Sequence, residues 1–259
     1  MPIKISIIIP LYNQHKKLLE CLESIKNQNH PLTPFPRNTR DRLLVKEGKE
    51  CGVEVIVVND GSTDITSSEL DDELLNGPRN GRRPLIGVAD RLVRGRVIHQ
   101  ENQGAPSARN RGFKESTGEY VIFCDADVVM REDMLEKMNR VLDENPNASY
   151  AYSSFKFGWK KFKLWEFSAN RLKQMPYIHT TSLIRREHFP GFDPSLKRLQ
   201  DWDLWLTMLL NGYEGKWINE ILFTVKSGGT ISKWLPSFFS GFDAKYKDAV
   251  RIIKQKHNL

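Results

Sequence analysis

The sequence of 259 residues has only three cysteines, Cys21, Cys51 and Cys124, and no Cys-x-x-Cys pair. Their number and wide spacing exclude a disulfide-stapled scaffold and the usual zinc-ligand patterns, so we expect reduced thiols. No apolar run approaches the ~20 residues that a membrane-spanning helix needs. The chain enters an apolar run at Ile5 without a leader-like segment. These absences predict a cytoplasmic protein, soluble or peripheral at the cytoplasmic face of a membrane.

Two glycine-rich phosphate-binding signatures are also missing. No G-x-G-x-x-G follows the first apolar run, and no G-x-x-x-x-G-K-[ST] occurs, which excludes a dinucleotide-binding turn and a P-loop. The formal net charge of +7 would suit an anionic partner, but six arginines fall in a Gly/Pro-containing stretch, residues 79–96. We interpret that stretch as a solvated loop and expect no nucleic-acid partner.

Apolar runs alternate with helical patterns along the first half of the chain. Strands are predicted over residues 5–9, 53–58, 96–99 and 120–123, and helices over residues 14–27, 107–116 and 130–142. This alternation of nearly continuous apolar runs with helices predicts an α/β fold with a mostly parallel central sheet. In such sheets, ligands bind outside the carboxyl ends of the strands. The polar, proline-rich residues 29–52 form an insertion whose purpose the sequence does not indicate.

No linker or low-complexity stretch divides the chain. We therefore predict one catalytic domain over residues 1–232, with a nucleotide-binding half of about 1–128 and an acceptor-side half of about 129–232. In the tail, residues 233–259, aromatic and aliphatic residues recur at four-residue spacing among lysines. This pattern suits an amphipathic helix in peripheral contact with a membrane. It suits equally a helix packed on the catalytic domain or on a partner subunit.

Two carboxylates, Asp125 and Asp127, follow the buried strand predicted over residues 120–123. Because two neighbouring, partly buried carboxylates repel each other, the pair is best explained by a cation between them. Oxygen ligands select Mg²⁺ or Mn²⁺, and such ions usually keep open positions for phosphate oxygens. The pair therefore indicates a nucleotide diphosphate site, unless the two residues only cap the following helix.

A second acidic cluster begins a helix predicted over residues 201–210. Asp201 lies in or just before its first turn, where it either caps the helix or acts as a general base. We expect Trp205 in the core and Trp202, on the opposite face, stacked on a sugar ring, and we place acceptor contacts at Trp202 and Asp203. His179 is either a packed, hydrogen-bonded residue or a substitute metal ligand.

Together, five segments resemble the family 2 glycosyltransferases of GT-A fold, in matching order over about residues 3–232. They are residues 7–13 (IIIPLYN), 57–64 (VVNDGSTD), 102–110 (NQGAPSARN), 125–127 (DAD) and 200–206 (QDWDLWL). The resemblance implies an inverting transferase in glycan or polysaccharide biosynthesis. It would use a nucleotide-sugar, usually a UDP-sugar, and Mn²⁺ or Mg²⁺. The acceptor would be a glycan, a lipid-linked glycan or a protein.

The resemblance also assigns roles to single residues. Pro10 and Tyr12 would border the nucleotide pocket, Asp60 would contact the base and Arg109 would hold the nucleotide. Asp125 would lie near the ribose and the metal, Asp127 would be the direct metal ligand, and Asp201 would deprotonate the acceptor hydroxyl.

The chain departs from the family pattern at three positions. Asn59 stands where many relatives have a first Asp, Gln200 where a Glu often precedes the base, and Ser227 where a histidine is usual. Two other functions stay open. A sugar nucleotidyltransferase is disfavoured because residues 11–14 form no phosphate loop. A non-catalytic nucleotide-sugar or glycan-binding module is supported by Ser227 and opposed by Asp60, Asp127 and Asp201.

Overall fold

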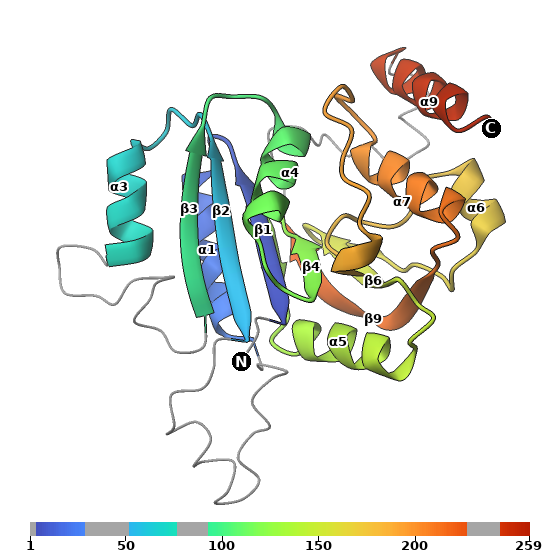
Figure 1. The fold of residues 1–259 in the computed structure, drawn as a ribbon, viewed down its shortest axis with the longest axis horizontal. Helices are drawn as coiled ribbons and strands as arrows, with labels where there is room; N and C mark the ends of the chain where they lie inside the picture. The colour runs from blue at the N-terminus through green and yellow to red at the C-terminus, as the bar shows by residue number, and fades with distance from the viewer. Residues whose placement is uncertain (1–3, 29–51, 77–92, 227–243) are drawn as a thin grey trace, which may run out of the picture.

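The computed structural model describes residues 4–28, 52–76, 93–226 and 244–259 (Figure 1). Nine strands form one sheet in this part of the chain. They are β1 (Ile5–Leu11), β2 (Val53–Asp60), β3 (Val93–Gln100), β4 (Tyr120–Phe123), β5 (Val128–Met130), β6 (Tyr150–Phe157), β7 (Lys160–Phe162), β8 (Leu183–Arg185) and β9 (Gly215–Val225). The strand order is β3-β2-β1-β4-β8-β6-β9-β5, and β7 pairs with β6.

The sheet is parallel in residues 1–128, the predicted nucleotide-binding half, as far as β4. β1 pairs in parallel with β2 on one side and with β4 on the other, and β2 pairs in parallel with β3. β8 joins β4 and β6 in antiparallel register, whereas β6 and β9 run parallel to each other. The prediction of a mostly parallel α/β sheet is confirmed. Because β1, β2 and β4 run the same way, their carboxyl ends meet at one edge.

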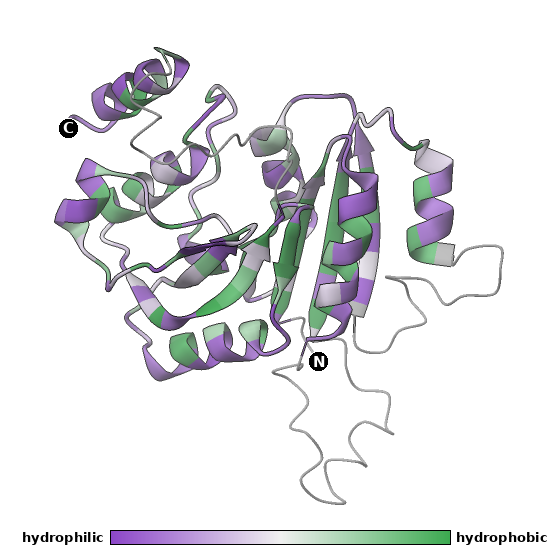
Figure 2. Cartoon of the chain, turned by 180° about the vertical axis from the view of Figure 1, so that it is seen from behind, coloured by the Kyte–Doolittle hydropathy of each residue, from purple (hydrophilic) through white to green (hydrophobic). Residues whose placement is uncertain are grey.

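Helices cover both faces of this sheet, with α4 in front of the strands and α1 behind them in Figure 1; Figure 2 shows the apolar strands between them. The helices are α1 (His15–Lys26), α3 (Ser67–Asp71), α4 (Ala105–Glu115), α5 (Met134–Glu144), α6 (Ala169–Gln174), α7 (Gln200–Leu210) and α9 (Ala244–Lys256). Within the described residues there are also two short turns, a π-helical turn at Asp72–Asn76 and a 3₁₀ turn at Arg186–His188. No helix in the described ranges is both long and apolar enough to cross a membrane.

The core explains how closely α4 approaches the sheet. Ile5, Ile7, Ile8 and Ile9 of β1 are completely buried. A Cβ atom at Gly112 would lie only 2.5 Å from Cγ2 of Ile8, so only glycine permits this packing distance. Because α4 carries Arg109 one turn earlier, this contact sets how far Arg109 lies from the sheet edge.

The helix predicted over residues 130–142 begins later than expected. Residues 128–130 instead form β5, which pairs antiparallel with β9 at Val128 and Val225. The local pattern could not show this pairing, because the partner strand is almost 100 residues away. The helix itself, α5, starts at Met134.

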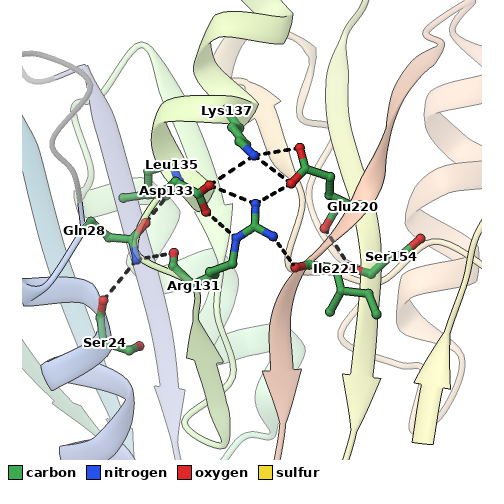
Figure 3. Close-up of polar contacts among 10 residues, drawn as sticks. Ser24, Gln28, Arg131, Asp133, Leu135, Lys137, Ser154, Glu220 and Ile221 are labelled. Atoms are coloured by element: carbon green, nitrogen blue, oxygen red, sulfur yellow. Dashed lines mark hydrogen bonds and ion pairs between the residues drawn. The ribbon is translucent and has the colours of Figure 1, made fainter.

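A polar network around Arg131 holds β5 in place (Figure 3). Arg131 pairs with Asp133 and donates hydrogen bonds to Glu220 at 2.6 Å and to the carbonyl of Ile221 at 3.1 Å. The buried Gln28, two residues after α1, donates to the Arg131 carbonyl at 2.8 Å and to the Ser24 carbonyl of α1 at 3.1 Å, and it accepts from the Leu135 N–H at 3.1 Å. The network joins α1, α5 and β9 around β5, which directly follows Asp127.

Candidate active site

A cleft of about 520 Å³ opens at the carboxyl edge of β1, β2 and β4. Every residue predicted to contact the nucleotide or metal, and the predicted base, lines it: Pro10, Tyr12, Asp60, Arg109, Asp125, Asp127 and Asp201. Three separate acidic segments of the sequence therefore meet at one cleft. The cleft size suits a nucleotide-sized ligand.

Asp60 fixes the loop that leads into α4. Its carboxylate accepts hydrogen bonds from the Gln100 side chain and from the N–H groups of Gln103 and Gly104, each at 2.8 Å. Gly61 follows in the left-handed region with a φ of +72°, and a Cβ there would lie 2.9 Å from the Asn102 nitrogen. The ends of β2 and β3 therefore approach each other through a glycine and a buried carboxylate. Oδ1 of that carboxylate accepts two of these hydrogen bonds and Oδ2 accepts the third.

Asp125 and Arg109 form a tight ion pair across the cleft floor. Arg109 Nη2 donates to Asp125 Oδ1 at 2.6 Å, and Nη1 donates to Gln200 Oε1 at 2.9 Å. Burial raises the pKa of Asp125, but the charge of Arg109, a contribution from His179 and the hydrogen bond from Arg109 together hold the pKa below its usual value. Gln200 thus supplies an oxygen acceptor to the guanidinium where the family pattern often has a charged Glu.

Asp127 lies beside this pair in the cleft. It is 7% exposed, and burial together with the charge of Asp125 raises its pKa to about 6. An ionised carboxylate that is disfavoured in this way is stabilised by a bound cation. The Asp127 carbonyl accepts the Lys226 N–H at 2.8 Å, so the end of β9 lies next to this carboxylate.

These carboxylates fit a divalent ion that shares its coordination with the substrate. Within residues 4–28, 52–76, 93–226 and 244–259, no group of three or more His, Cys, Asp or Glu side chains could enclose a metal. Mg²⁺ and Mn²⁺ are commonly held by one or two carboxylates, with phosphate and water oxygens completing the shell. Asp127 and Asp125 supply that number of ligands.

Asp201 stands at the start of α7, across the cleft from the sheet edge. Leu199, the residue before α7, has a φ of +57°, an unusual backbone conformation that turns the chain into the helix. Asp201 Oδ1 accepts the Trp202 N–H at 2.8 Å. Burial raises the pKa of Asp201 above its usual value, despite the opposing effect of this hydrogen bond. A carboxylate with a raised pKa is a better proton acceptor than an exposed aspartate.

His179 lines the same cleft as a packed, neutral imidazole. Its Nδ1 accepts the Thr181 N–H at 3.1 Å, and its ring centroid lies 5.2 Å from those of Phe155 and Phe223. Burial lowers its pKa to about 4, against the opposing charge of Asp125. Because Nδ1 is an acceptor, the ring proton is on Nε2. This geometry agrees with the packed, hydrogen-bonded alternative.

The prediction that Trp202 stacks on a sugar ring is wrong in this structure. Trp202 is 1% exposed, and its indole Nε1 donates to the Leu172 carbonyl of α6 at 2.6 Å. Trp205, on the other side of α7, is buried as expected and donates to the Ile178 carbonyl at 2.9 Å. Because α6 covers the side of α7 that was expected to face the acceptor, both indoles are core residues.

Asp203 is likewise unavailable to an acceptor. It is 4% exposed and accepts hydrogen bonds from His257 Nε2 at 2.7 Å and from Lys256 Nζ at 2.9 Å. Its partners come from the C-terminal end of α9, so Asp203 anchors that helix on α7 (Figure 1). The assignment of Asp203 to acceptor binding is corrected accordingly.

The described part of the tail packs against the domain. Ile253 of α9 is completely buried, and Lys256 also pairs with Asp193 at 2.7 Å. Burial and then the charge of Asp201 raise the pKa of Tyr246, which places the start of α9 near the predicted base. The tail aromatics before residue 244 lie outside the described residues. Ser227 does too, whereas Lys226 pairs with Glu20 at 3.0 Å.

Four further cleft residues were not selected from the sequence. Phe155 and Phe157 of β6 form one wall, and Lys197 and Arg198 lie just before Leu199, the residue that leads into α7. Lys197 and Arg198 could have been found from their position three and two residues before Gln200. Cations at that position would face a phosphate bound at the carboxyl edge of the sheet. The two phenylalanines alternate along a strand whose position the sequence did not indicate.

The sequence of this chain was compared with those of known protein families and curated proteins. The profile of glycosyl transferase family 2 matches residues 6–197. An uncharacterized glycosyltransferase of Rickettsia felis is 26% identical over 251 residues, which cover 92% of this chain and 35% of the relative. The glycosyltransferase GlyG of Streptococcus pneumoniae is 32% identical over 141 residues, which cover 54% of this chain and 35% of that relative. The chain thus spans about a third of the length of these relatives.

Solved structures share the fold. The S. aureus TarS fragment 1–349 in complex with UDP superposes with a TM-score of 0.65 at 20% identity, covering 99% of this chain and 67% of that one. The mannosyltransferase PcManGT from Pyrobaculum calidifontis, in complex with GDP-Man and Mn²⁺, gives a TM-score of 0.58 at 18% identity, covering 93% of this chain and 62% of that one. The predicted GT-A fold is confirmed, and the chain belongs to glycosyl transferase family 2.

Proposed function

We propose that this chain transfers a sugar from a nucleotide-sugar, most simply a UDP-sugar, to an acceptor hydroxyl with inversion at the anomeric carbon. The observation that supports this most directly is that the buried Asp127 and the half-buried Asp201, both carboxylates with raised pKa values, line one cleft. One carboxylate suits a metal-bound diphosphate and the other suits a proton acceptor. The UDP complex of TarS and the GDP-Man and Mn²⁺ complex of PcManGT support the donor class.

In this proposal, some cleft residues act on the leaving diphosphate and Asp201 acts on the attacking hydroxyl. When bound by Asp127 and Asp125, a divalent ion would stabilise the negative charge that develops on the leaving diphosphate. Arg109 orients Asp125, and Lys197 and Arg198 add positive charge at the cleft. Asp201 accepts the proton of the acceptor hydroxyl as that oxygen attacks the anomeric carbon. Attack on the side opposite the leaving nucleotide gives inversion.

Calorimetric titration tests the donor and the metal together. UDP, GDP, CDP and dTDP are titrated into wild type, Asp127→Asn and Asp201→Asn, each with Mn²⁺, Mg²⁺ or EDTA. We expect one nucleotide to bind in a metal-dependent manner, with binding lost in Asp127→Asn and kept in Asp201→Asn. Asp248→Asn, an exposed change on α9, is the matched control.

Product analysis then separates the alternatives. Transfer or slow hydrolysis of the matching nucleotide-sugar, with an inverted product, supports the proposal. Nucleotide-sugar binding with neither reaction over a broad acceptor screen would support a non-catalytic module. Release of pyrophosphate from a nucleoside triphosphate would support a nucleotidyltransferase.

A further inference from the structure

The β6–β7 hairpin projects an isolated tryptophan from the surface. Trp159 lies in its turn and is 94% exposed, well above the other large apolar residues in the described ranges. Tryptophan normally buries most of its surface in a folded protein. A ring this exposed touches almost nothing in its own chain, so the hairpin tip is convex.

The same hairpin has a concentrated positive charge. Residues 156–163 contain four lysines and no acidic residue. Lys160, Lys161 and Lys163 are exposed, and none of the four lysines forms an ion pair with a carboxylate in the part of the chain that the structure describes. The tip therefore presents an exposed aromatic ring with three exposed lysines close to it in the sequence.

Aromatic stacking holds the hairpin to the cleft wall. Phe155 stacks on Phe162 across the strand pair at a centroid distance of 5.1 Å, and on Phe223 of β9 at 5.3 Å. The Gly158 N–H donates to the Val225 carbonyl at 2.8 Å. Both Phe157 and Val225 line the cleft. The hairpin is therefore a continuation of the active-site wall.

The distance from cleft to tip is short. Trp159 is two residues beyond Phe157, which corresponds to about 7 Å of extended chain. A surface that held the ring of Trp159 would lie next to the mouth of the cleft. An acceptor presented from that surface would enter the cleft that Phe157 and Asp201 both line.

Shape and charge favour one kind of partner for this tip. Sugar-binding aromatic residues usually form a concave or flat platform, whereas a single protruding ring flanked by lysines suits the interfacial layer of a bilayer. Anionic lipid headgroups attract each nearby lysine. We propose that the β6–β7 hairpin docks the protein on an anionic membrane surface and turns the cleft toward a lipid-carried acceptor, an inference whose acceptor part rests on the proposed function.

Co-sedimentation of the full chain with vesicles tests the docking. The vesicles contain phosphatidylcholine, with or without phosphatidylglycerol. We expect binding only with the anionic lipid, weakened by salt. The triple change Lys160→Gln, Lys161→Gln and Lys163→Gln is expected to lower the partition coefficient on the order of 100-fold, since each lysine near the surface contributes about fivefold. Trp159→Ala is expected to give a smaller decrease.

Matched controls separate this surface from the tail. Leu210→Ala removes another exposed apolar side chain, 69% exposed, and Lys247→Gln, Arg251→Gln and Lys254→Gln remove exposed cations from α9. Neither control is expected to change vesicle binding. The proposal is overturned if wild type does not bind anionic vesicles, or if the α9 triple lowers binding as much as the hairpin triple. It is also overturned if the hairpin triple loses binding to dextran sulfate, a soluble polyanion, while keeping vesicle binding.

The docking and the proposed function can fail independently. Nucleotide titration without vesicles reports the donor site alone, and we expect the hairpin variants to match wild type there. A wild type that binds vesicles but no nucleotide refutes the proposed function and leaves the docking intact. A wild type that binds nucleotide but no vesicles does the reverse.

Discussion

The guanidinium of Arg109 donates a hydrogen bond to the carboxylate of Asp125 at 2.6 Å. Through its second terminal nitrogen it also contacts Gln200, so one side chain joins α4, the end of β4 and the start of α7. Arg109 is 6% exposed, and its position depends on the close packing of α4 at Gly112. One buried guanidinium thus links the nucleotide side of the cleft to the helix that carries Asp201.

Replacing Arg109 should damage binding and stability together. Arg109→Met leaves the Asp125 carboxylate without its partner, and because that side chain is 34% exposed we expect a loss of about 2 kcal/mol, less than for a fully buried pair. Nucleotide affinity should fall at least roughly tenfold. Arg109→Lys should recover part of the stability and less of the affinity, because a lysine cannot contact Asp125 and Gln200 in the same planar geometry. Urea denaturation and calorimetry measure the two effects, and Arg111→Met, an exposed change on α4, is the control.

Asp201→Asn should lower the transfer rate by about 100- to 10,000-fold without unfolding the protein. Burial raises the pKa of Asp201 in the folded state, so ionised Asp201 is a cost to folding at neutral pH. Removing the charge should therefore leave the melting temperature equal or higher. An Asp201→Asn enzyme with normal turnover would contradict the assignment of the base.

The acid limb of the pH–rate profile should also report Asp201. The base works only when ionised, and activity should fall as pH decreases through its pKa. Because that pKa is raised, the fall should begin at a higher pH than for an ordinary aspartate. Single-turnover rates at saturating metal and donor, measured from neutral to acidic pH, test this. A rate that stays constant down to the range of exposed aspartates would contradict it.

Much of this site could be predicted from local sequence, for a physical reason. Asp60, Asp125 and Asp127 follow continuous apolar runs, and parallel strands bring their carboxyl ends to one edge whatever connects them. Predicting strands β1, β2 and β4 was therefore enough to bring these three residues to the same edge of the sheet. The start of α7 was found in the same way, from its helical pattern.

The acceptor side could not be predicted in this manner. Helical periodicity places Trp202 on the face opposite Trp205, but it cannot show whether another element packs on that face. Here α6 does so, and its Leu172 is 30 residues earlier in the chain. The partner of Asp203 is His257, 54 residues later. An amphipathic pattern such as that of α9 shows that a face will be covered, but it does not identify what covers it.

Two substitutions of His179 should have opposite effects. The amide oxygen of asparagine can replace Nδ1 as acceptor for the Thr181 N–H, whereas the longer glutamine side chain can place a donor near the position of Nε2–H. If that donor contacts the bound donor sugar or diphosphate, His179→Asn should keep stability and lose turnover. His179→Gln should then lose stability and keep more of the turnover. Measurements of melting temperature and single-turnover rate for both variants test this prediction. Equal turnover in both variants would indicate that His179 has a purely packing role.

The buried hydrogen bond between Asp203 and His257 should couple the C-terminal helix to catalysis. Both side chains are at most 5% exposed, so breaking the pair leaves a buried polar group unpaired, and Asp203→Asn should cost about 3 kcal/mol. Because Asp203 lies in the first turn of α7, a loosened α9 should also disturb Asp201 and lower the transfer rate while nucleotide affinity stays unchanged. Lys254→Ala, an exposed change on α9, should do neither. A double-mutant cycle of Asp203→Asn and His257→Ala measures the coupling, and additive effects on stability would show that α9 is held by its apolar contacts, such as Ile253, alone.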